Sequence, residues 1–432
     1  MLDIRFIREH PDRVQEAATQ KGYSVNIGEL LSTDDTRREL LSKADELRTQ
    51  RNELSSQMKG GGAPSPELIE AGKHLKTELA EIEDHLRIVD EEFAHLLKQV
   101  PNMPHGDVPL GTSEDDNVEV KVVGDKPNFD FTPKNHYEIA EAKGWLDKTR
   151  AAKVAGSRFA YVMGDMVLLQ QAIIQFVMTT LSNEDKIKEI AEGAGLSVAT
   201  TPFIPVLPPL MIRTEAYDQM DRLEPRDDRY KIEGEELWLQ GSAEHVLGSM
   251  HAGEIFDAAQ LPIRYLGFAT SFRKEAGTYG KDMEGLIRMH QFDKLEMESF
   301  SEPDSSFSEH LLFVAVQEYL LQQLKLPYHV LMKCTADIGK PNARGVDMEV
   351  WLPGQGQYRE THTADYMTDY QARRLQTRIR TANGIVLAHT NDATAFALGR
   401  AMVAIIENNQ TAEGDVVVPQ VLRPYLGGRE VL

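Results

Sequence analysis

Cysteine is almost absent from this chain of 432 residues, which contains only Cys334. A single cysteine excludes an internal disulfide and a zinc site built from several cysteines, and it is typical of proteins in a reducing compartment. Long apolar runs are also missing, because glutamines interrupt the stretch 166–178 and Arg400 interrupts the stretch 393–406. Neither stretch offers the roughly 20 apolar residues of a membrane span, and the charged N-terminus does not resemble a secretory signal. We therefore expect a cytoplasmic protein with no zinc and no membrane partner.

An excess of positive charge is lacking as well. The chain has 47 Lys and Arg residues against 68 Asp and Glu residues, which gives a formal net charge of −21. This balance excludes a protein that holds nucleic acid by a broad basic surface, although a local site remains possible. A phosphate-binding loop of the Gly-x-x-x-x-Gly-Lys-Ser/Thr type is absent too, because the nearest candidate, Gly280-Lys281-Asp282, lacks the hydroxyl. The chain is 41% hydrophobic and 27% charged, which indicates ordinary globular domains.

Heptad spacing of apolar residues marks the N-terminal part. Residues 35–59 contain no proline or glycine and carry leucines seven residues apart, whereas 60–66 is rich in glycine and proline. Two offset apolar series then follow. The first is Leu68, Leu75, Ile82, Val89 and Leu96, and the second is Leu79, Leu86, Phe93 and Val100. This pattern predicts an antiparallel coiled-coil arm over about 35–100. We expect the arm to belong to an N-terminal domain of residues 1–110, with a short helix over 8–21 at its base.

Charge is unevenly distributed along this arm. Basic residues gather near the predicted turn, and acidic residues predominate towards the base. A polyanion would therefore meet the distal part of the arm, although a purely structural or dimerising coiled coil would show the same heptads. The distal basic residues are Arg48, Arg51, Lys59, Lys73 and Lys76.

The remaining residues, 111–432, alternate between strand-like and helix-like patterns. The pattern predicts an α+β fold with a mainly antiparallel sheet flanked by helices. Strands are expected at 117–123, 205–212, 237–240, 263–272, 291–300, 328–334, 346–352 and 385–389. Helices are expected at 135–148, 165–181, 243–250, 302–324 and 393–409.

One predicted hairpin carries residues suited to nucleotide chemistry. Its first strand ends in Arg273, Lys274 and Glu275, and its second strand follows a glycine-rich turn and presents Arg288 and Phe292. Side chains two residues apart share one face of a strand. Arginine binds phosphate through two parallel N–H groups, and an aromatic ring stacks on a base. A nucleotide site is one interpretation, and a hairpin surface crossed by ion pairs is the other.

The same hairpin resembles motif 2 of seryl-tRNA synthetases, which are class II aminoacyl-tRNA synthetases. The resemblance lies in Phe272-Arg273-x-Glu275, in the loop Gly277-x-x-Gly280, and in Gly285-Leu286-Ile287-Arg288-x-His290-Gln291-Phe292-x-Lys294-x-Glu296. Other blocks resemble the family in the same order along the chain: residues 206–210 with Pro209 (motif 1), Ser242-Ala243-Glu244, residues 350–354, 358–360 and 369–374, and Ala397-x-Gly399-Arg400 with residues 407–410 and 419–425 (motif 3 and the C-terminal tail). Together they cover almost the whole chain.

The resemblance implies a catalytic domain over 111–432 and an arm that binds tRNA. The family joins L-serine to ATP as seryl-adenylate and then transfers serine to the terminal adenosine of tRNA(Ser), and in some members also to tRNA(Sec). Motif 1 implies a homodimer, and the ATP site implies Mg²⁺ with Glu360 as a ligand. Arg273 and Arg400 would be catalytic. The other implied ATP-binding residues are Lys274, Glu275, Arg288, Phe292, Glu360, Thr361, His362 and Thr363, and the implied serine-binding residues are Ser242, Ala243, Glu244, Arg273, Glu296 and Thr394.

Several positions depart from the family pattern. Ser242 stands where threonine is usual, and Glu284 lies where a basic residue is common. The segments 218–230, 360–363 and 390–394 are variants as well. Two alternatives remain open at this point. One is a related ligase that loads an amino acid onto a carrier protein, and the other is a non-catalytic paralogue that binds RNA or a partner.

Overall fold

The computed structural model describes residues 1–58, 65–275 and 285–432, which form two compact units, Met1–Met103 and Pro104–Leu432. The division falls a few residues before the predicted boundary at 110. Residues 104–110 join the second unit because their backbone is bonded there. The His105 N–H donates to the Ala343 carbonyl at 2.7 Å, and the Thr335 N–H donates to the Pro109 carbonyl at 2.9 Å.

The first unit consists of helices α1 (Ile4–Glu9), α2 (Pro11–Gln20), α3 (Ile27–Met58) and α4 (Pro66–Gln99). The helix predicted over 8–21 is therefore two helices, because the residue before a proline, His10, is disfavoured in helical conformation. The α3 helix also begins earlier than predicted, and the Asn26 side chain accepts the Glu29 N–H at its start (3.1 Å). Lys59 and the predicted turn up to Pro64 lie outside the described residues.

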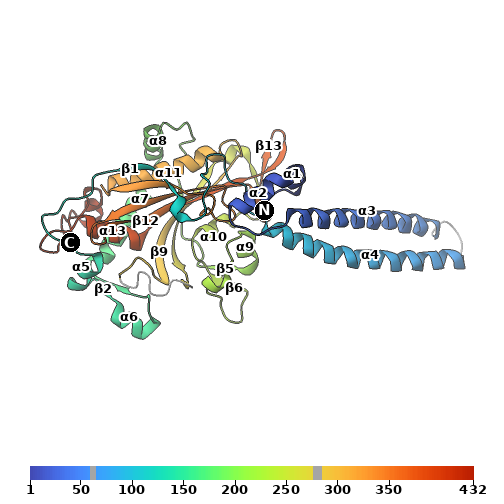
Figure 1. The fold of residues 1–432 in the computed structure, drawn as a ribbon, viewed down its shortest axis with the longest axis horizontal. Coiled ribbons are helices and arrows are strands. Elements are labelled where there is room, and N and C mark those ends of the chain that lie inside the picture. Colours follow the sequence, from blue (N-terminus) through green and yellow to red (C-terminus); the bar gives the residue numbers. More distant parts are fainter. Residues whose placement is uncertain (59–64, 276–284) are drawn as a thin grey trace. The chain divides into compact units, whose positions relative to one another are not determined.

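Helices α3 and α4 form the antiparallel pair that the heptads predict (Figure 1). Leu40 packs with Leu86 and Val89, and further along α3 Leu47 packs with Leu79. Later residues of α3 meet earlier residues of α4, which is the signature of an antiparallel hairpin. The predicted coiled-coil arm is thus confirmed for the described residues.

The second unit is built on a mixed sheet of eight strands in the order β1-β10-β11-β12-β15-β9-β8-β4, in which every neighbouring pair is antiparallel except β4 and β8. The sheet strands are β1 (Val118–Val123), β4 (Ile204–Val206), β8 (Ile263–Phe272), β9 (Gln291–Ser301), β10 (Tyr328–Met332), β11 (Arg344–Leu352), β12 (Gln357–Thr368) and β15 (His389–Ala397). Smaller sheets use β2 (Leu146–Asp147) with β3 (Tyr161–Val162), β5 (Met211–Arg213) with β6 (Leu237–Leu239), and β7 (Ile255–Asp257) with β13 (Arg378–Thr381) and β14 (Gly384–Leu387).

One face of the large sheet is covered by helices. Apolar side chains of β9, β11 and β15 pack there with those of α7, α8, α11 and α13 in the main core, which includes Leu295, Met297 and Phe313. The intervening residues of the same strands, among them Lys294 and Glu296, point to the opposite face. The helices of this unit are α5 (His136–Ala142), α6 (Lys148–Ala155), α7 (Asp165–Leu181), α8 (Glu184–Gly193), α9 (Thr214–Gln219), α10 (Glu244–Gly248), α11 (Ser306–Gln323), α12 (Tyr370–Leu375) and α13 (Leu398–Asn408).

Three features of this unit differ from the sequence-based expectation. The helix predicted over 393–409 is wrong in its first part, because residues 393–397 belong to β15 and the helix begins at Leu398. This short Ala- and Thr-rich run lies between β12 and β9, where pairing on both sides overrides local helix preference. Strand β12 was not predicted at all, and the strand expected over 205–212 is interrupted between Val206 and Met211.

Candidate active site

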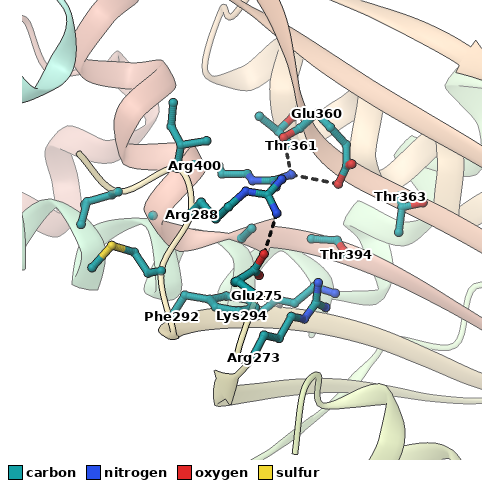
Figure 2. Close-up of a pocket in the computed structure, with 15 residues that line it drawn as sticks. Arg273, Glu275, Arg288, Phe292, Lys294, Glu360, Thr361, Thr363, Thr394 and Arg400 are labelled. Atoms are coloured by element: carbon teal, nitrogen blue, oxygen red, sulfur yellow. Dashed lines mark hydrogen bonds and ion pairs between the residues drawn. The ribbon is translucent and has the colours of Figure 1, made fainter. Parts of the chain in front are cut away.

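A cavity of about 140 Å³ opens on the sheet face away from the helices (Figure 2). Its walls come from the end of β8, from β9, β12 and β15, and from the first turn of α13. Nine of the predicted site residues line it, namely Arg273, Glu275, Arg288, Phe292, Glu360, Thr361, Thr363, Thr394 and Arg400. Segments that are up to 127 residues apart in the chain thus meet at one place because their strands are neighbours in the sheet.

The cations and anions of the cavity are paired with one another. Arg288 Nη1 lies 2.6 Å from Glu275 Oε2, and Arg400 Nη1 lies 2.9 Å from Glu360 Oε1 (Figure 2). The cations Arg400, Lys333 and Arg273 hold the pKa of Glu360 below its usual value. Glu360 is therefore a carboxylate at neutral pH, at the edge of a cavity rich in arginine.

Arg273 and Phe292 form a second arrangement in this cavity. The Arg273 Nε donates to the Gly241 carbonyl at 3.0 Å, and its guanidinium lies 5.3 Å from the centre of the Phe292 ring. The hydrogen bond and the cation–π contact fix the guanidinium plane beside an aromatic face. A planar base and an anionic phosphate could both be bound here.

Two predicted ATP-binding residues lie outside the cavity. His362 is buried on the other side of β12, where its Nε2 lies 2.9 Å from the Ala395 carbonyl and its ring meets Phe396. A bulge in the β11–β12 pairing puts the neighbours Glu360 and Thr361 on the cavity wall and leaves His362 facing the core. Lys274 is exposed, and its ammonium lies 5.6 Å from the centre of the Tyr230 ring. We therefore leave both out of the proposed ATP site.

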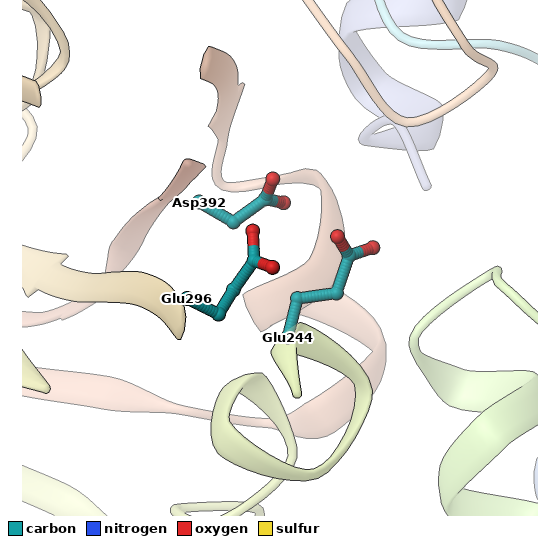
Figure 3. Close-up of side chains that lie close together, drawn as sticks. All are labelled: Glu244, Glu296 and Asp392. Atoms are coloured by element: carbon teal, nitrogen blue, oxygen red, sulfur yellow. The ribbon is translucent and has the colours of Figure 1, made fainter. Parts of the chain in front are cut away.

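Beside the cavity, carboxylates of different elements converge. Glu244 at the start of α10, Glu296 on β9 and Asp392 on β15 each place an oxygen within 4.8 Å of the others' oxygens (Figure 3). Glu298 follows on the same face of β9 and pairs in register with Asp392. We call Glu244, Glu296, Glu298 and Asp392 the acidic cluster. All four side chains are buried.

Two cations and a hydroxyl hold part of this cluster. Arg222 Nε lies 2.7 Å from Glu244 Oε1, and the ammonium of Lys294 contacts Glu296. The Ser242 hydroxyl donates to Glu296 Oε2 at 3.1 Å and accepts from Lys294 at 3.3 Å. Ala243, which lies between Ser242 and Glu244 in the chain, is fully buried. The predicted serine-binding residues thus lie together, next to the cavity that Lys294 and Thr394 also line.

Burial and charge affect the four carboxyl groups differently. Burial would raise the pKa of Glu244, but Arg222, Lys294 and Arg273 outweigh burial and lower that pKa to about 2. Burial raises the pKa of Glu296, and Glu244 adds to this effect. The pKa values of Glu298 and Asp392 are raised well above the ordinary value by burial and by the neighbouring carboxylates. Glu244 is thus a fixed anion, whereas Glu298 and Asp392 favour the protonated form.

Sequence reasoning did not assign a role to Lys294 or Arg222. Lys294 is two residues from both Phe292 and Glu296, so strand alternation alone would have placed all three on one face. Arg222 lies in a variant segment with no regular pattern, and only the folded chain brings it to Glu244.

Comparison with known proteins identifies the chain. Residues 1–104 match the model of the seryl-tRNA synthetase N-terminal domain, and residues 229–409 match the class II tRNA synthetase core domain (G, H, P, S and T). The serine–tRNA ligase of Deinococcus radiodurans is 40% identical over 100% of this chain and 99% of its own length. The chain belongs to the seryl-tRNA synthetase family. The two matched domains include both the helical arm and the catalytic core.

Solved structures agree with this family. The seryl-tRNA synthetase of Pyrococcus horikoshii, complexed with ATP, is 35% identical with a TM-score of 0.89 over 100% of this chain and 99% of that one. The cytoplasmic serine–tRNA ligase of Naegleria fowleri, in complex with AMP, is 26% identical with a TM-score of 0.85 over 100% and 98%. The predicted fold of a helical arm plus a class II core is confirmed. Among the described helices, none combines the length and apolar content that a membrane crossing requires.

Proposed function

We propose that this member of the seryl-tRNA synthetase family is a cytoplasmic serine–tRNA ligase that binds ATP in the cavity and L-serine beside the acidic cluster. In the first step, a carboxylate oxygen of serine bonds to the α-phosphorus of ATP. The bond from that phosphorus to the bridging oxygen breaks, and pyrophosphate leaves. In the second step, a ribose hydroxyl of the terminal adenosine of tRNA(Ser) bonds to the seryl carbonyl carbon, the bond from that carbon to the phosphate oxygen breaks, and AMP leaves. The gathering of Arg273, Arg288 and Arg400 around Phe292 in one cavity carries this proposal.

When ATP binds, the arginines of the cavity exchange their carboxylate partners for phosphate groups. Phe292 stacks on adenine, and Glu275 accepts a hydrogen bond from the adenine amino group. Arg288, now bonded to Glu275, turns to the bent triphosphate, and Arg400 leaves Glu360 for the γ-phosphate. Phosphate attracts a guanidinium more strongly than a single carboxylate does, because it offers several anionic oxygens. The existing ion pairs keep these side chains ordered before ATP arrives.

Mg²⁺ fits the carboxylate that Arg400 vacates. The Glu360 side chain is 50% exposed and anionic, and the Thr363 hydroxyl lies on the same wall. Hard cations prefer carboxylate and phosphate oxygens. When bound, Mg²⁺ would neutralise the phosphates. Arg273 then stabilises the charge that develops at the α-phosphate, as a guanidinium held in place before the reaction can.

The amino acid lies between cavity and cluster. Glu244 and Ser242 accept hydrogen bonds from the α-ammonium, with Ala243 as their spacer, and Arg273 contacts the carboxylate. Glu296 and Thr394 bond the side-chain hydroxyl. A site that bonds this hydroxyl leaves its own polar groups unpaired with alanine, which rejects alanine by ~10⁴–10⁵.

The arm presents tRNA with separated cations. Arg51, Lys73 and Lys76 are exposed on α3 and α4, and Arg48 is half-buried, whereas Lys59 lies outside the described residues. These cations bind the backbone of tRNA(Ser), and tRNA(Sec) is a second candidate because it would meet the same surface.

A second copy of the chain covers an apolar strip on the catalytic unit. Leu207 is 79% exposed, and Ile204, Leu210 and Met211 of the same segment are exposed as well. Exposed apolar strips of this kind mark interfaces. Native mass spectrometry should give twice the 48.5 kDa chain mass, and a monomer at micromolar concentration would contradict the homodimer.

Serine-dependent exchange of pyrophosphate into ATP tests the proposed function. The purified chain should catalyse exchange with L-serine and Mg²⁺ and should then charge tRNA(Ser). Exchange with a different amino acid only, or with none, would overturn the proposal. Loading of a carrier protein in place of tRNA would favour the carrier-loading alternative.

A further inference from the structure

The acidic cluster contains more carboxyl groups than the neighbouring cations can pair. Its four carboxyl groups are buried, and the cations in contact with them among the described residues are Arg222 and Lys294. His245 touches Glu244 but adds no cation, because burial lowers its pKa well below the ordinary value. A fifth carboxylate, Asp365, shares the same Arg222 at 4.0 Å. Buried charges are normally paired, so Glu298 and Asp392 favour the protonated form in the empty site, and a cationic ligand would replace those protons.

Several oxygens of the cluster lack a hydrogen-bond partner. They are Glu296 Oε1, both side-chain oxygens of Glu298, and Asp392 Oδ1. Glu298 is 1% exposed, and the β9–β15 register sets it opposite Asp392 on the face that carries Glu296. The unsatisfied acceptors therefore lie on one face of the sheet, in neighbouring strands. Burial without a partner is costly, which is why such groups usually receive a donor.

Serine supplies too few donors for these acceptors. In the proposed function the α-ammonium is held by Ser242 and Glu244, so only the hydroxyl remains, with a single hydrogen to donate. A side-chain ammonium of the same size would donate three hydrogens and add one positive charge. It would replace the protons that Glu298 and Asp392 favour in the empty site.

We propose that this site also activates an α-amino acid that carries an ammonium on its β-carbon, with L-2,3-diaminopropionate as the simplest example. This inference rests on the proposed function, because the same cavity supplies ATP. The chemical step is the same as with serine. The carboxylate oxygen bonds to the α-phosphorus, pyrophosphate leaves, and the β-ammonium takes no part in bond making.

A divalent metal is a poorer occupant of the cluster. Lys294 and Arg222 already reach Glu296, Glu244 and Asp392, and both would repel a doubly charged ion at contact distance. An ammonium is less charged and binds as a hydrogen-bond donor, as the two resident cations do. The site also lies in the segments that depart from the family pattern, since Arg222 falls within 218–230 and Asp392 within 390–394.

Pyrophosphate exchange by the full-length chain tests this inference with L-serine, L-2,3-diaminopropionate and L-2-aminobutyrate. The side chain of L-2-aminobutyrate has as many heavy atoms as that of diaminopropionate but no charge, so this amino acid controls for size. We expect kcat/KM for diaminopropionate within about tenfold of that for serine and at least about 100-fold above that for aminobutyrate.

Asp392→Asn and Glu298→Gln each remove one negative charge and keep the side-chain shape. Each should lower the ratio of diaminopropionate to serine kcat/KM at least about tenfold. The ratio does not depend on how much of a variant folds, and the exposed Glu119→Gln serves as a control that leaves the ratio unchanged.

The outcomes separate the two proposals. Exchange with serine and none with diaminopropionate above the aminobutyrate level overturns this inference and leaves the proposed function standing. No exchange with either amino acid overturns the proposed function. If calorimetry shows that Mn²⁺ or Zn²⁺ binds without ATP, and if Asp392→Asn abolishes this binding, the cluster is a metal site and the ammonium proposal is overturned.

Discussion

The ion pairs between the two arm helices are exposed, whereas a pair in the catalytic unit is fully enclosed. Arg37–Asp90, Lys43–Glu78 and Arg48–Glu83 keep every side chain at least 31% exposed, but Arg264 and Glu309 are 0% and 2% exposed. Exposed pairs add little stability because water and salt screen them, whereas a buried pair depends on complete hydrogen bonding. The arm is therefore held by its leucine seam, and its charges remain available to a ligand.

The same contrast separates two kinds of recognition. The arm offers separated cations on a regular helix surface, which suits a polyanion of fixed spacing. The catalytic unit gathers charge inside a cavity where the sheet sets each position, which suits a small ligand with a defined pattern of donors and acceptors. If the contrast is correct, damage to one region should leave the other function intact.

Shortening the arm should have the largest effect. Replacement of residues 36–98 by a short Gly-Ser linker removes the described basic residues of the arm and leaves the catalytic unit, which has its own core. We expect tRNA charging to fall more than about 1,000-fold because most phosphate contacts are lost. Serine-dependent pyrophosphate exchange should stay within about threefold. Charging at the normal rate would disprove the role of the arm.

Arg273→Ala should give the opposite result. It removes a guanidinium fixed by the Gly241 carbonyl and the Phe292 ring. Loss of one positioned charge at a transition state typically costs ~10²–10³ in rate. Pyrophosphate exchange should fall by that factor, while filter binding of tRNA should change little. A parallel loss of tRNA binding would argue against separate sites.

Breaking the enclosed pair should destabilise the catalytic unit alone. In Glu309→Gln the Arg264 guanidinium, which also donates to the Ala199 carbonyl, keeps its charge without a carboxylate. We expect a loss of about 3 kcal/mol in the free energy of unfolding. Trp145, Trp238 and Trp351 all lie in this unit, so their fluorescence in urea measures it. An unchanged midpoint would contradict the expectation.

A pH profile offers a smaller effect in the same unit. Burial lowers the pKa of His362 to about 3, whereas an unfolded histidine has a pKa near 6.5. Between these values only the unfolded state binds the proton, so stability falls as the pH drops from about 6.5 towards 3. His362→Gln should make the slope between pH 6 and 5 shallower by up to ~1.4 kcal/mol per pH unit. Identical slopes in urea titrations would refute the buried neutral ring.

Arg48→Ala should have the smallest effect on stability. Its partners Asp45 and Glu83 are exposed, so the helix signal in circular dichroism should melt within about 2 °C of the unchanged chain. The same variant should weaken tRNA binding and reduce its salt dependence by about one counterion. A large drop in melting temperature would mean that exposed pairs do stabilise the arm.

Some elements were predictable because local pattern and tertiary structure agree. The strand 263–272 and the helix 165–181 have the predicted bounds, and the heptads gave the helical pairing of the arm. Residues 393–397 show the opposite case. Their Ala- and Thr-rich sequence has no strong strand signal, and only the neighbours β12 and β9 make it a strand.

The sequence by itself determined the arm, the mainly antiparallel sheet and the family, because these follow from periodicity and from motifs that are local in the chain. It also listed most residues of the cavity. Only the tertiary structure decided that His362 turns away from the cavity, that Lys294 bridges cavity and cluster, and that Arg222 reaches Glu244. Those outcomes depend on a bulge, on strand register and on a loop without a regular pattern, and none of these is encoded in the spacing of residues along the chain.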